Sequence, residues 1–418
     1  MVYIISKDGH PLMPTDRHGK VRRMLKQSKA KVIKRCPFTV QLLYETTEAT
    51  QPITLGVDAG SKHIGLSAAT EGKELYASEV EFRADIVDKL STRREFRRAR
   101  RNRKTRYRKP RFDNRVKSKH KGWLAPSLQA KVDSHIKVIE DVHMILPITE
   151  IVIEVAQFDT QKIKNPDIEG EGYQQGEQLG FWNVREYVFH RDGHKCQCCK
   201  GKSKDPILNV HHIESRKTGG DAPNNLITLC ETCHKAYHKG EIELPRTIKR
   251  GASFKDAAFM GIMRWACYNR LKETYPNVRM TYGYITKNTR IRAGLEKSHV
   301  VDARCISGHP NAEPLGHYFY KKKVRCHNRQ LHRATIAKGG YRKNNQAEKY
   351  VFGYQLFDKV RFNGKEAFIF GRRTSGSFDI RTLDGEKLSA GVSYKKLKPL
   401  EKRKTYLTER RSGNSSQG

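Results

Sequence analysis

Apolar and polar residues alternate with two different periods along this chain, and together the periods predict a mixed α/β fold. The stretch 53–70 holds two apolar runs around a glycine-bearing turn, which predicts a β-hairpin. Residues 127–146 have a helical period, and the near-continuous apolar run ITEIVIEVAQFD follows shortly after them. Such a run is typical of a strand that is buried on both faces, so we expect a sheet inside an α/β layer.

The remaining segments carry shorter signals. Apolar runs broken by lysine and arginine indicate a small β-containing module at the N-terminus, and residues 255–275 have a helical period. The stretch 278–306 predicts a strand, a basic loop and a helix. Alternating short runs beyond residue 316 predict a small C-terminal β-barrel, with an Asn-Gly turn at Asn363 and an Asp-Gly turn at Asp384.

The balance of charge narrows the class of partner. The 418 residues have a formal net charge of +38, and a surplus of this size implies an acidic partner. Nucleic acid is the usual one, and an anionic membrane is the competitor. The sequence has no uninterrupted apolar run of about 18 residues and no signal-peptide pattern, so we expect neither membrane insertion nor export.

Positive charge is most concentrated between Arg93 and Lys121, where 16 lysines or arginines stand against two acids. Few helix breakers precede Pro110, so we expect a helix over residues 83–108, about 39 Å long. A charge run is often a solvated face or an unstructured tail. Because this one is internal and nearly single-signed, contact with nucleic-acid phosphates is the better interpretation.

Nine cysteines in a long basic chain without a signal peptide favour metal binding over disulfides. Four of them form two Cys-x-x-Cys pairs, Cys196 with Cys199 and Cys230 with Cys233. Two such pairs supply four thiolates for a tetrahedral, closed, structural Zn²⁺ site. Cys198 lies between the first pair and is interpreted as a bystander, although a register that uses Cys196 and Cys198 is an alternative.

Zinc leaves His211, His212, Asn225 and His234 of the same module unexplained. Phosphodiester hydrolysis needs a base that activates water and a divalent cation that neutralises the scissile phosphate. The order His-His, Asn, and a histidine directly after the last cysteine resembles that of HNH endonucleases, which have a ββα-metal fold. The resemblance implies that His212 is the general base, that His211 and His234 bind the catalytic metal, and that Asn225 holds the loop orienting the base. Further zinc ligands, surface histidines or an inactive relic are the alternatives.

A second set of candidate catalytic residues is spread over three segments. Asp58 lies in the predicted hairpin and Glu154 in the predicted buried strand, while His299 and Asp302 share one face of a predicted helix. An acid in an apolar strand is costly to bury unless a metal or a cation pairs with it. Three carboxylates and a histidine can hold two Mg²⁺ ions for in-line phosphodiester cleavage. This is the logic of RNase H-like nucleases such as RuvC.

These features occur in an order that resembles one architecture, shared by the CRISPR type II effector nucleases and the small transposon-encoded IscB proteins. Three details favour IscB. The sequence Pro-Leu-Met-Pro at residues 11–14 resembles the motif of the family's PLMP domain, and RREFRRARR resembles its RRxRR segment. The chain is also too short for a large helical recognition lobe after the arginine-rich segment.

The resemblance implies an RNase H-like (RuvC) domain split into three segments, an inserted ββα-metal HNH zinc module, an arginine-rich bridge helix and a small C-terminal β-barrel. The implied PLMP domain spans residues 1–51, and the three RuvC segments span 52–82, 122–165 and 243–315. The bridge helix and basic linker occupy 83–121, a further linker occupies 166–179, and the HNH domain occupies 180–242. Residues 316–411 would form a C-terminal domain that contacts RNA and the target-adjacent motif, and 412–418 a disordered tail.

Membership of this family implies an RNA-guided DNA endonuclease that binds a structured noncoding RNA (ωRNA) and makes double-strand breaks in complementary DNA. HNH would cut the guide-paired strand with one Mg²⁺, and RuvC the displaced strand with two, held by Asp58, Glu154 and Asp302. The protein would be a monomer in a ribonucleoprotein of a bacterium or archaeon, in the cytoplasm or nucleoid, without a membrane partner. The expected RNA contacts are Arg93, Arg94, Arg97, Arg98, Arg100, Arg101, Thr286, Lys287 and Arg290, and the expected readers of the DNA motif are Arg372 and Arg373.

Two other function classes compete with this interpretation. An unguided HNH homing or nicking endonuclease accounts for the zinc and for His212, but not for Asp58, Glu154 and Asp302 or for the amount of positive charge. A nucleic-acid-binding protein with inactive nuclease domains conflicts with the full set of expected catalytic residues. Dependence of cleavage on added RNA distinguishes the first alternative, and metal-dependent cleavage excludes the second.

Overall fold

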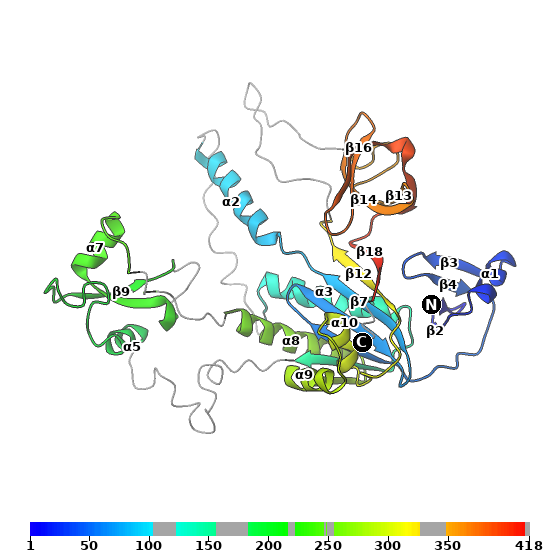
Figure 1. The fold of residues 1–418 in the computed structure, drawn as a ribbon, viewed down its shortest axis with the longest axis horizontal. Coiled ribbons are helices and arrows are strands. Elements are labelled where there is room, and N and C mark those ends of the chain that lie inside the picture. The colour runs from blue at the N-terminus through cyan, green and yellow to red at the C-terminus, as the bar shows by residue number, and fades with distance from the viewer. Residues whose placement is uncertain are drawn as a thin grey trace. The chain divides into compact units, whose positions relative to one another are not determined.

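The computed structural model describes residues 1–102, 123–155, 183–215, 222–245, 248, 255–326 and 348–413. The predicted linker 166–179, the basic stretch beyond residue 102 and the end of the predicted tail lie outside these ranges. The chain divides into two compact units, Met1–Ala156 with Met263–Gly418, and Gln157–Ile262 (Figure 1). Each helix in the described ranges is either too short or too polar to cross a bilayer.

A seven-stranded mixed sheet with the order β11-β8-β5-β6-β7-β12-β18 forms the centre of the first unit. An antiparallel meander confirms the predicted hairpin and consists of β5 (Thr54–Ala59), β6 (His63–Ala69) and β7 (Glu74–Glu81). The predicted buried strand is β8 (Glu150–Val155), which pairs in parallel with β5 and with β11 (Val278–Tyr282). Beyond β7, the sheet continues with β12 (His317–Lys323) and β18 (Tyr406–Ser412).

Most of the predicted helices are present. The two helical periods correspond to α3 (Pro126–His143) and α8 (Lys255–Thr274), and the described part of the arginine-rich helix is α2 (Ile86–Asn102). His299 and Asp302 both lie on α10 (His299–Ile306), as predicted.

The expected basic loop at residues 286–290 is wrong, because these residues belong to helix α9 (Gly283–Arg292). The segment contains no proline, and its one glycine is the first helical residue. Its threonines, isoleucines and asparagine each disfavour a helix by less than about 1 kcal/mol, which tertiary contacts can offset. Packing of α9 against α10 and β11 therefore decides the conformation.

Helix α10 lies directly on β5 and β6 because two glycines leave room for its backbone. A Cβ atom on Gly56 would lie 1.9 Å from the carbonyl oxygen of Ala303, and one on Gly65 would lie 1.9 Å from that of His299. Side chains cannot approach a backbone this closely, so no larger residue fits without moving α10. The two glycines therefore set the height of His299 and Asp302 above the sheet.

Two smaller sheets belong to the same unit. The N-terminal sheet has the order β2-β1-β4-β3, and Tyr3 joins it to the large sheet by packing on Tyr76 and donating a hydrogen bond to the Leu75 carbonyl. Its elements are β1 (Val2–Ile5), β2 (Pro11–Thr15), α1 (His18–Lys26), β3 (Ala30–Lys34) and β4 (Thr39–Leu42). The expectation of a β-containing N-terminal module is met.

The C-terminal sheet is antiparallel and has the order β16-β15-β14-β13-β17. Its strands are β13 (Lys359–Phe362), β14 (Lys365–Arg372), β15 (Ser377–Arg381), β16 (Lys387–Ser393) and β17 (Lys398–Glu401). Asn363 and Gly364 have φ values of 48° and 79°, as the predicted Asn-Gly hairpin turn requires. Closure of this sheet into a barrel stays a prediction. Since β12 and β18 belong to the large sheet, the predicted boundary at residue 316 is not a boundary between sheets.

The second unit contains a ββα module. Strands β9 (Leu208–His212) and β10 (Leu226–Cys230) are antiparallel, and α7 (Glu231–Lys239) follows directly. A further helix, α5 (Val184–Arg191), precedes them, and the 3-10 turn η2 (Pro223–Asn225) leads into β10. Buried Ile227 and Leu229 pack against three buried cysteines, so thiols make up much of this core.

We predict that Gly56→Ala destabilises the protein by about 1–3 kcal/mol or more, because its Cβ has no space beneath α10. Gly72→Ala is the matched control, since nothing lies within 4 Å of a Cβ at that position. Urea unfolding of both variants measures the difference. Equal stability of the two would contradict the tight contact between α10 and the sheet.

Candidate functional sites

The two Cys-x-x-Cys pairs converge in the second unit. Ligand atoms of Cys196, Cys199, Cys230 and Cys233 all lie within 4.8 Å of one another, and the sulfurs of Cys199 and Cys230 are 3.8 Å apart. Four thiolates at about 2.3 Å from a tetrahedral Zn²⁺ are separated by about 3.8 Å, so the cluster fits zinc. Cys198 is outside this group, which favours the 196/199 register.

The electrostatics of the cysteines agree with a metal site. A hydrogen bond from Ser203 lowers the pKa of Cys199 to about 6, which favours its thiolate. Burial instead raises the pKa values of Cys196 and Cys233, so that several adjacent thiolates need a cation to stabilise them. With all four positions taken by sulfur, the site is closed and structural.

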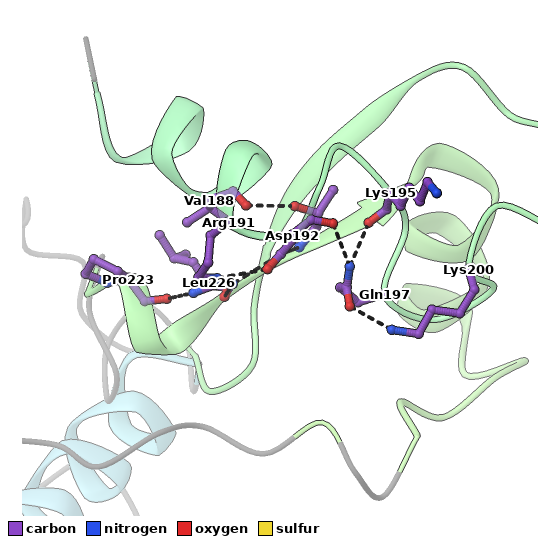
Figure 2. Close-up of polar contacts among 9 residues, drawn as sticks. Val188, Arg191, Asp192, Lys195, Gln197, Lys200, Pro223 and Leu226 are labelled. Carbon is purple, nitrogen blue, oxygen red and sulfur yellow. Dashed lines mark hydrogen bonds and ion pairs between the residues drawn. The ribbon is translucent and has the colours of Figure 1, made fainter. Parts of the chain in front are cut away.

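A polar network that the sequence did not indicate joins α5 to the module's strands (Figure 2). Arg191 donates hydrogen bonds to the carbonyls of Pro223 and Leu226, at 2.7 and 2.8 Å, on either side of Asn225. The carboxylate of Asp192 pairs with Arg191 at 2.8 Å, and the side-chain amide of Gln197 donates to the Asp192 carbonyl at 2.9 Å. These contacts fix the turn that carries Asn225 relative to the first cysteine pair.

Three histidines of the second unit form a second possible metal site. Ring nitrogens of His211 on β9 and of His234 and His238 on α7 lie within 4.8 Å of one another. Burial, reinforced by the neighbouring histidines, lowers the pKa of His211 to about 4, so it is a neutral ligand near pH 7. Three nitrogen donors suit a transition ion better than Mg²⁺. His238 was not among the ligands predicted from the sequence. It lies four residues after His234, and this spacing places both histidines on one helical face.

Asn225 fixes the loop that leaves β9. Its Oδ1 accepts a hydrogen bond from the Glu214 amide at 2.9 Å, and its Nδ2 donates to the Glu214 carbonyl at 3.0 Å. Glu214 comes two residues after His212, so the asparagine holds the backbone next to the predicted base. Adjacent residues of a strand point to opposite faces, so His212 faces away from the cluster that contains His211.

The first unit brings the four dispersed candidates together. Val57 on β5 pairs with Ile153 on the parallel strand β8, and Asp58 and Glu154 are the next residues of these strands. Asp58 and Glu154 therefore lie at the same end of β5 and β8. From α10, His299 places Nδ1 2.7 Å from Oδ2 of Asp58. Burial raises the pKa of Glu154 and of Asp302, and the charge of Asp58 adds to both shifts. These acids therefore need positive charge nearby.

Two arginines supply that charge, and sequence reasoning missed the role of both. Nη1 of Arg264 lies 2.8 Å from Oε1 of Glu154, and its Nε donates to the Ala59 carbonyl at 2.7 Å. Nε of Arg290 lies 2.9 Å from Oδ1 of Asp302. The described acids thus pair with separate cations and are not gathered as tightly as the cysteines. Oxygen donors of this kind fit Mg²⁺, which would take over the neutralisation of the carboxylates.

Helix α3 fixes the turn that follows Asp58. The ring of His135 contacts the carbonyl oxygens of Lys131 and Gly60, at 2.8 and 3.2 Å. Lys131 donates a hydrogen bond to the Ser61 carbonyl at 2.6 Å. Burial lowers the pKa of His135 to about 4, so this support is uncharged near pH 7.

The residues expected to contact nucleic acid have different environments. Four of the six arginines, Arg93, Arg94, Arg97 and Arg98, are exposed on α2, and the side chains of Arg100 and Arg101 lie outside the described part. On α9, Lys287 is exposed, whereas Thr286 is buried and bonds Glu154, and Arg290 pairs with Asp302.

The two candidate motif readers of the C-terminal sheet are engaged within the protein. The guanidinium of Arg372 donates to the carbonyls of Lys349, Tyr354 and Glu348, at 2.6, 2.9 and 3.1 Å. Arg373 donates to the Ser377 hydroxyl at 3.3 Å and to the Ala390 carbonyl at 3.2 Å.

We predict that Cys230→Ser loses one equivalent of zinc and unfolds the ββα module, because the core of this module depends on the cluster. Cys198→Ser is the matched control and should keep the metal. Elemental analysis of the purified variants measures zinc per chain. Retention of a full equivalent by Cys230→Ser, or its loss from Cys198→Ser, would show that the ligand set is different.

Two protein-family models match parts of this chain. Residues 2–176 match the RRXRR protein family, and residues 196–240 match the HNH endonuclease family. A 63-residue stretch, 15% of this chain, is 36% identical to anaredoxin from Nostoc sp. and covers 79% of that protein.

Among solved structures, a Streptococcus thermophilus Cas9 bound to an AGGA PAM is 14% identical, with a TM-score of 0.33 over 62% of this chain and 32% of that one. The type II-C Cas9 of Actinomyces naeslundii is 12% identical, with a TM-score of 0.25 over 62% of this chain and 60% of that one. The chain thus spans about a third of the first protein's length and three fifths of the second's. The two family matches thus give an RRXRR segment over residues 2–176 followed by an HNH endonuclease domain over residues 196–240, an arrangement consistent with an IscB-like nuclease.

Proposed function

We propose that this protein is an RNA-guided DNA endonuclease that cuts the guide-paired strand at the HNH site and the displaced strand at the site on the seven-stranded sheet. The observation that supports the proposal is that one chain carries two separate clusters of candidate catalytic residues, the three histidines of the ββα module and the Asp58–His299 pair on the large sheet. The two strands of DNA have opposite polarity. A double-strand break at one position needs one cut in each strand, and two separate sites can make these two cuts. Guided pairing would supply the sequence specificity.

In the HNH site, His212 is the general base that removes a proton from the attacking water, and Asn225 holds the loop behind it. His211, His234 and His238 would hold one divalent ion, which supplies Lewis-acid stabilisation of the scissile phosphate when bound. The low pKa of His211 keeps this ligand unprotonated at neutral pH.

The seven-stranded sheet, with α3, α8, α9 and α10, is proposed to be an RNase H-like (RuvC) domain whose three segments flank the HNH unit. Asp58, Glu154 and Asp302 would hold two Mg²⁺ ions, which neutralise the attacking and leaving oxygens when bound. The guanidiniums of Arg264 and Arg290 pair with Glu154 and Asp302 in the described state, so metal binding must displace or reorient these arginines. His299, bonded to Asp58, is placed to accept or return a proton.

The arginine-rich helix α2 is proposed to be the bridge helix and to grip guide-RNA phosphates. Its described arginines are exposed, and guanidinium groups bind phosphate in a bidentate manner. A net charge of +38 suits a carrier of a long structured RNA better than an enzyme that only nicks DNA. Lys287 on α9 remains a candidate RNA contact.

The C-terminal sheet is proposed to read a target-adjacent motif. Arg372 and Arg373 would have to exchange their carbonyl contacts for base edges, so other basic residues of the same sheet are equally good candidates. An unguided HNH enzyme is the second candidate, since the described part of the ββα module contributes all the residues of both the four-cysteine cluster and the three-histidine cluster.

We predict that His212→Ala leaves a nick in the displaced strand only. Loss of the base should slow cutting of the guide-paired strand by at least about 100-fold, because general-base catalysis contributes that much. Strand-specific labels on a guide-matched duplex measure each cut. Continued cutting of both strands would show that His212 is not the base.

We predict that Asp58→Ala leaves the opposite nick, with the guide-paired strand cut at its usual rate. Asp58→Asn is the matched variant, since it keeps the shape but removes the charge. The combination with His212→Ala should bind the guided duplex without cutting it. Loss of both cuts from the single Asp58 variant, with folding intact, would contradict two independent sites.

A further inference from the structure

His63 on β6, Glu79 on β7 and His299 on α10 form a cluster that the proposed mechanism uses only in part. A ring nitrogen of each histidine and a carboxylate oxygen of Glu79 lie within 4.8 Å of one another. The rings of His63 and His299 are parallel, with an interplanar angle of 3° and centroids 5.4 Å apart. All three side chains are partly buried, and His299 also contacts Asp58.

We propose that these three residues form a binding site for a divalent transition-metal ion, of which Zn²⁺ is the physiological example. Imidazole nitrogens suit zinc and its neighbours in the transition series, and two histidines with one glutamate are a known kind of zinc ligand set. Mg²⁺ prefers oxygen donors, so this site and the carboxylate site should select different ions.

The contact between His63 and Glu79 supports this assignment. Nδ1 of His63 and Oε1 of Glu79 are 2.9 Å apart, yet within the described part of the chain the buried Nδ1 has no partner in hydrogen-bonding geometry. Two ligands at about 2.1 Å from one ion in octahedral or tetrahedral geometry are separated by about 3.0–3.4 Å. The pair therefore has the spacing of two ligands of one ion and lacks the geometry of a donor and an acceptor.

Sheet register preorganises the cluster. His63 pairs with Glu81, and Gly65 pairs with Glu79, so all four positions share the face that α10 covers. Glu81 is already held by Lys322 at 2.8 Å and by the Tyr320 hydroxyl, which leaves Glu79 as the carboxylate available to His63. Gly65 admits the backbone of His299 directly above this pair.

His299 belongs to both sites. Its Nδ1 bonds Asp58, so Nε2 is the nitrogen it can offer to an ion, and a carboxylate behind a ligating histidine is the usual second partner. On the proposed function, which this step assumes, zinc in the cluster would engage His299 and so slow cutting of the displaced strand. The HNH site shares none of these ligands.

Cobalt binding tests the site without any cleavage. In the full-length protein that retains its structural zinc, His211→Ala removes the histidine cluster of the HNH domain as a competing site. Titration with Co²⁺ alone should then give one visible-absorption event at neutral pH. Adding His63→Phe, which keeps the stacked ring but removes the nitrogens, or Glu79→Gln should weaken that event at least tenfold. If the Co²⁺ titration curve is the same with and without His63→Phe, or with and without Glu79→Gln, the proposal is wrong.

Zinc inhibition tests the link to catalysis. The His211→Ala protein should nick only the displaced strand in Mg²⁺, and low concentrations of added Zn²⁺ should slow this nick at least tenfold. His63→Phe should retain the Mg²⁺-dependent nick and lose the inhibition. Equal inhibition in both proteins would overturn the role of the cluster. If no displaced-strand nick occurs even in Mg²⁺, the proposed function fails, whereas the cobalt titration still decides the metal site.

Discussion

The close contact between α10 and the seven-stranded sheet is the constraint on which the first unit's chemistry depends. Asp58 and His299 are separated by 241 residues, and the bond of 2.7 Å between them exists only because Gly56 and Gly65 let the helix backbone rest on β5 and β6. A single added methyl group at either glycine would move the helix. The geometry of the acids proposed to be catalytic is thus set by backbone packing.

The buried carboxylates of the first unit also need positive charge to balance them. Buried carboxylates repel one another, and the chain relieves this with Arg264 and Arg290 in the described state. On the proposed function, divalent ions would do the same in a catalytic state, so arginine and metal would compete for the same oxygens. In the ββα module the candidate metal ligand is uncharged instead of anionic. A low pKa keeps His211 neutral near pH 7, so its ring nitrogen is able to bind a metal.

Sequence reasoning found the features that are local. Apolar periodicity predicted the hairpin, the buried strand β8 and the helices α3, α8 and α10, and cysteine spacing predicted the four-cysteine cluster that fits zinc. Features set by packing between distant segments were out of reach. Arg264, Arg290 and the pair His63 with Glu79 carry no local motif, and α9 adopts a helix because its neighbours favour one. Only His238 had a usable signal, its spacing from His234.

Whether a guide RNA directs the two sites can be read from the RNA that the protein carries. The gene would be expressed with its native flanking DNA, and the RNA that co-purifies with the protein would be sequenced. A guided nuclease should carry one dominant structured RNA that is encoded beside the gene and ends in a variable segment, and it should cleave only duplexes that match this segment. A random sample of cellular RNA, or none, together with cleavage that needs no RNA, would contradict guidance by RNA and favour an unguided HNH enzyme.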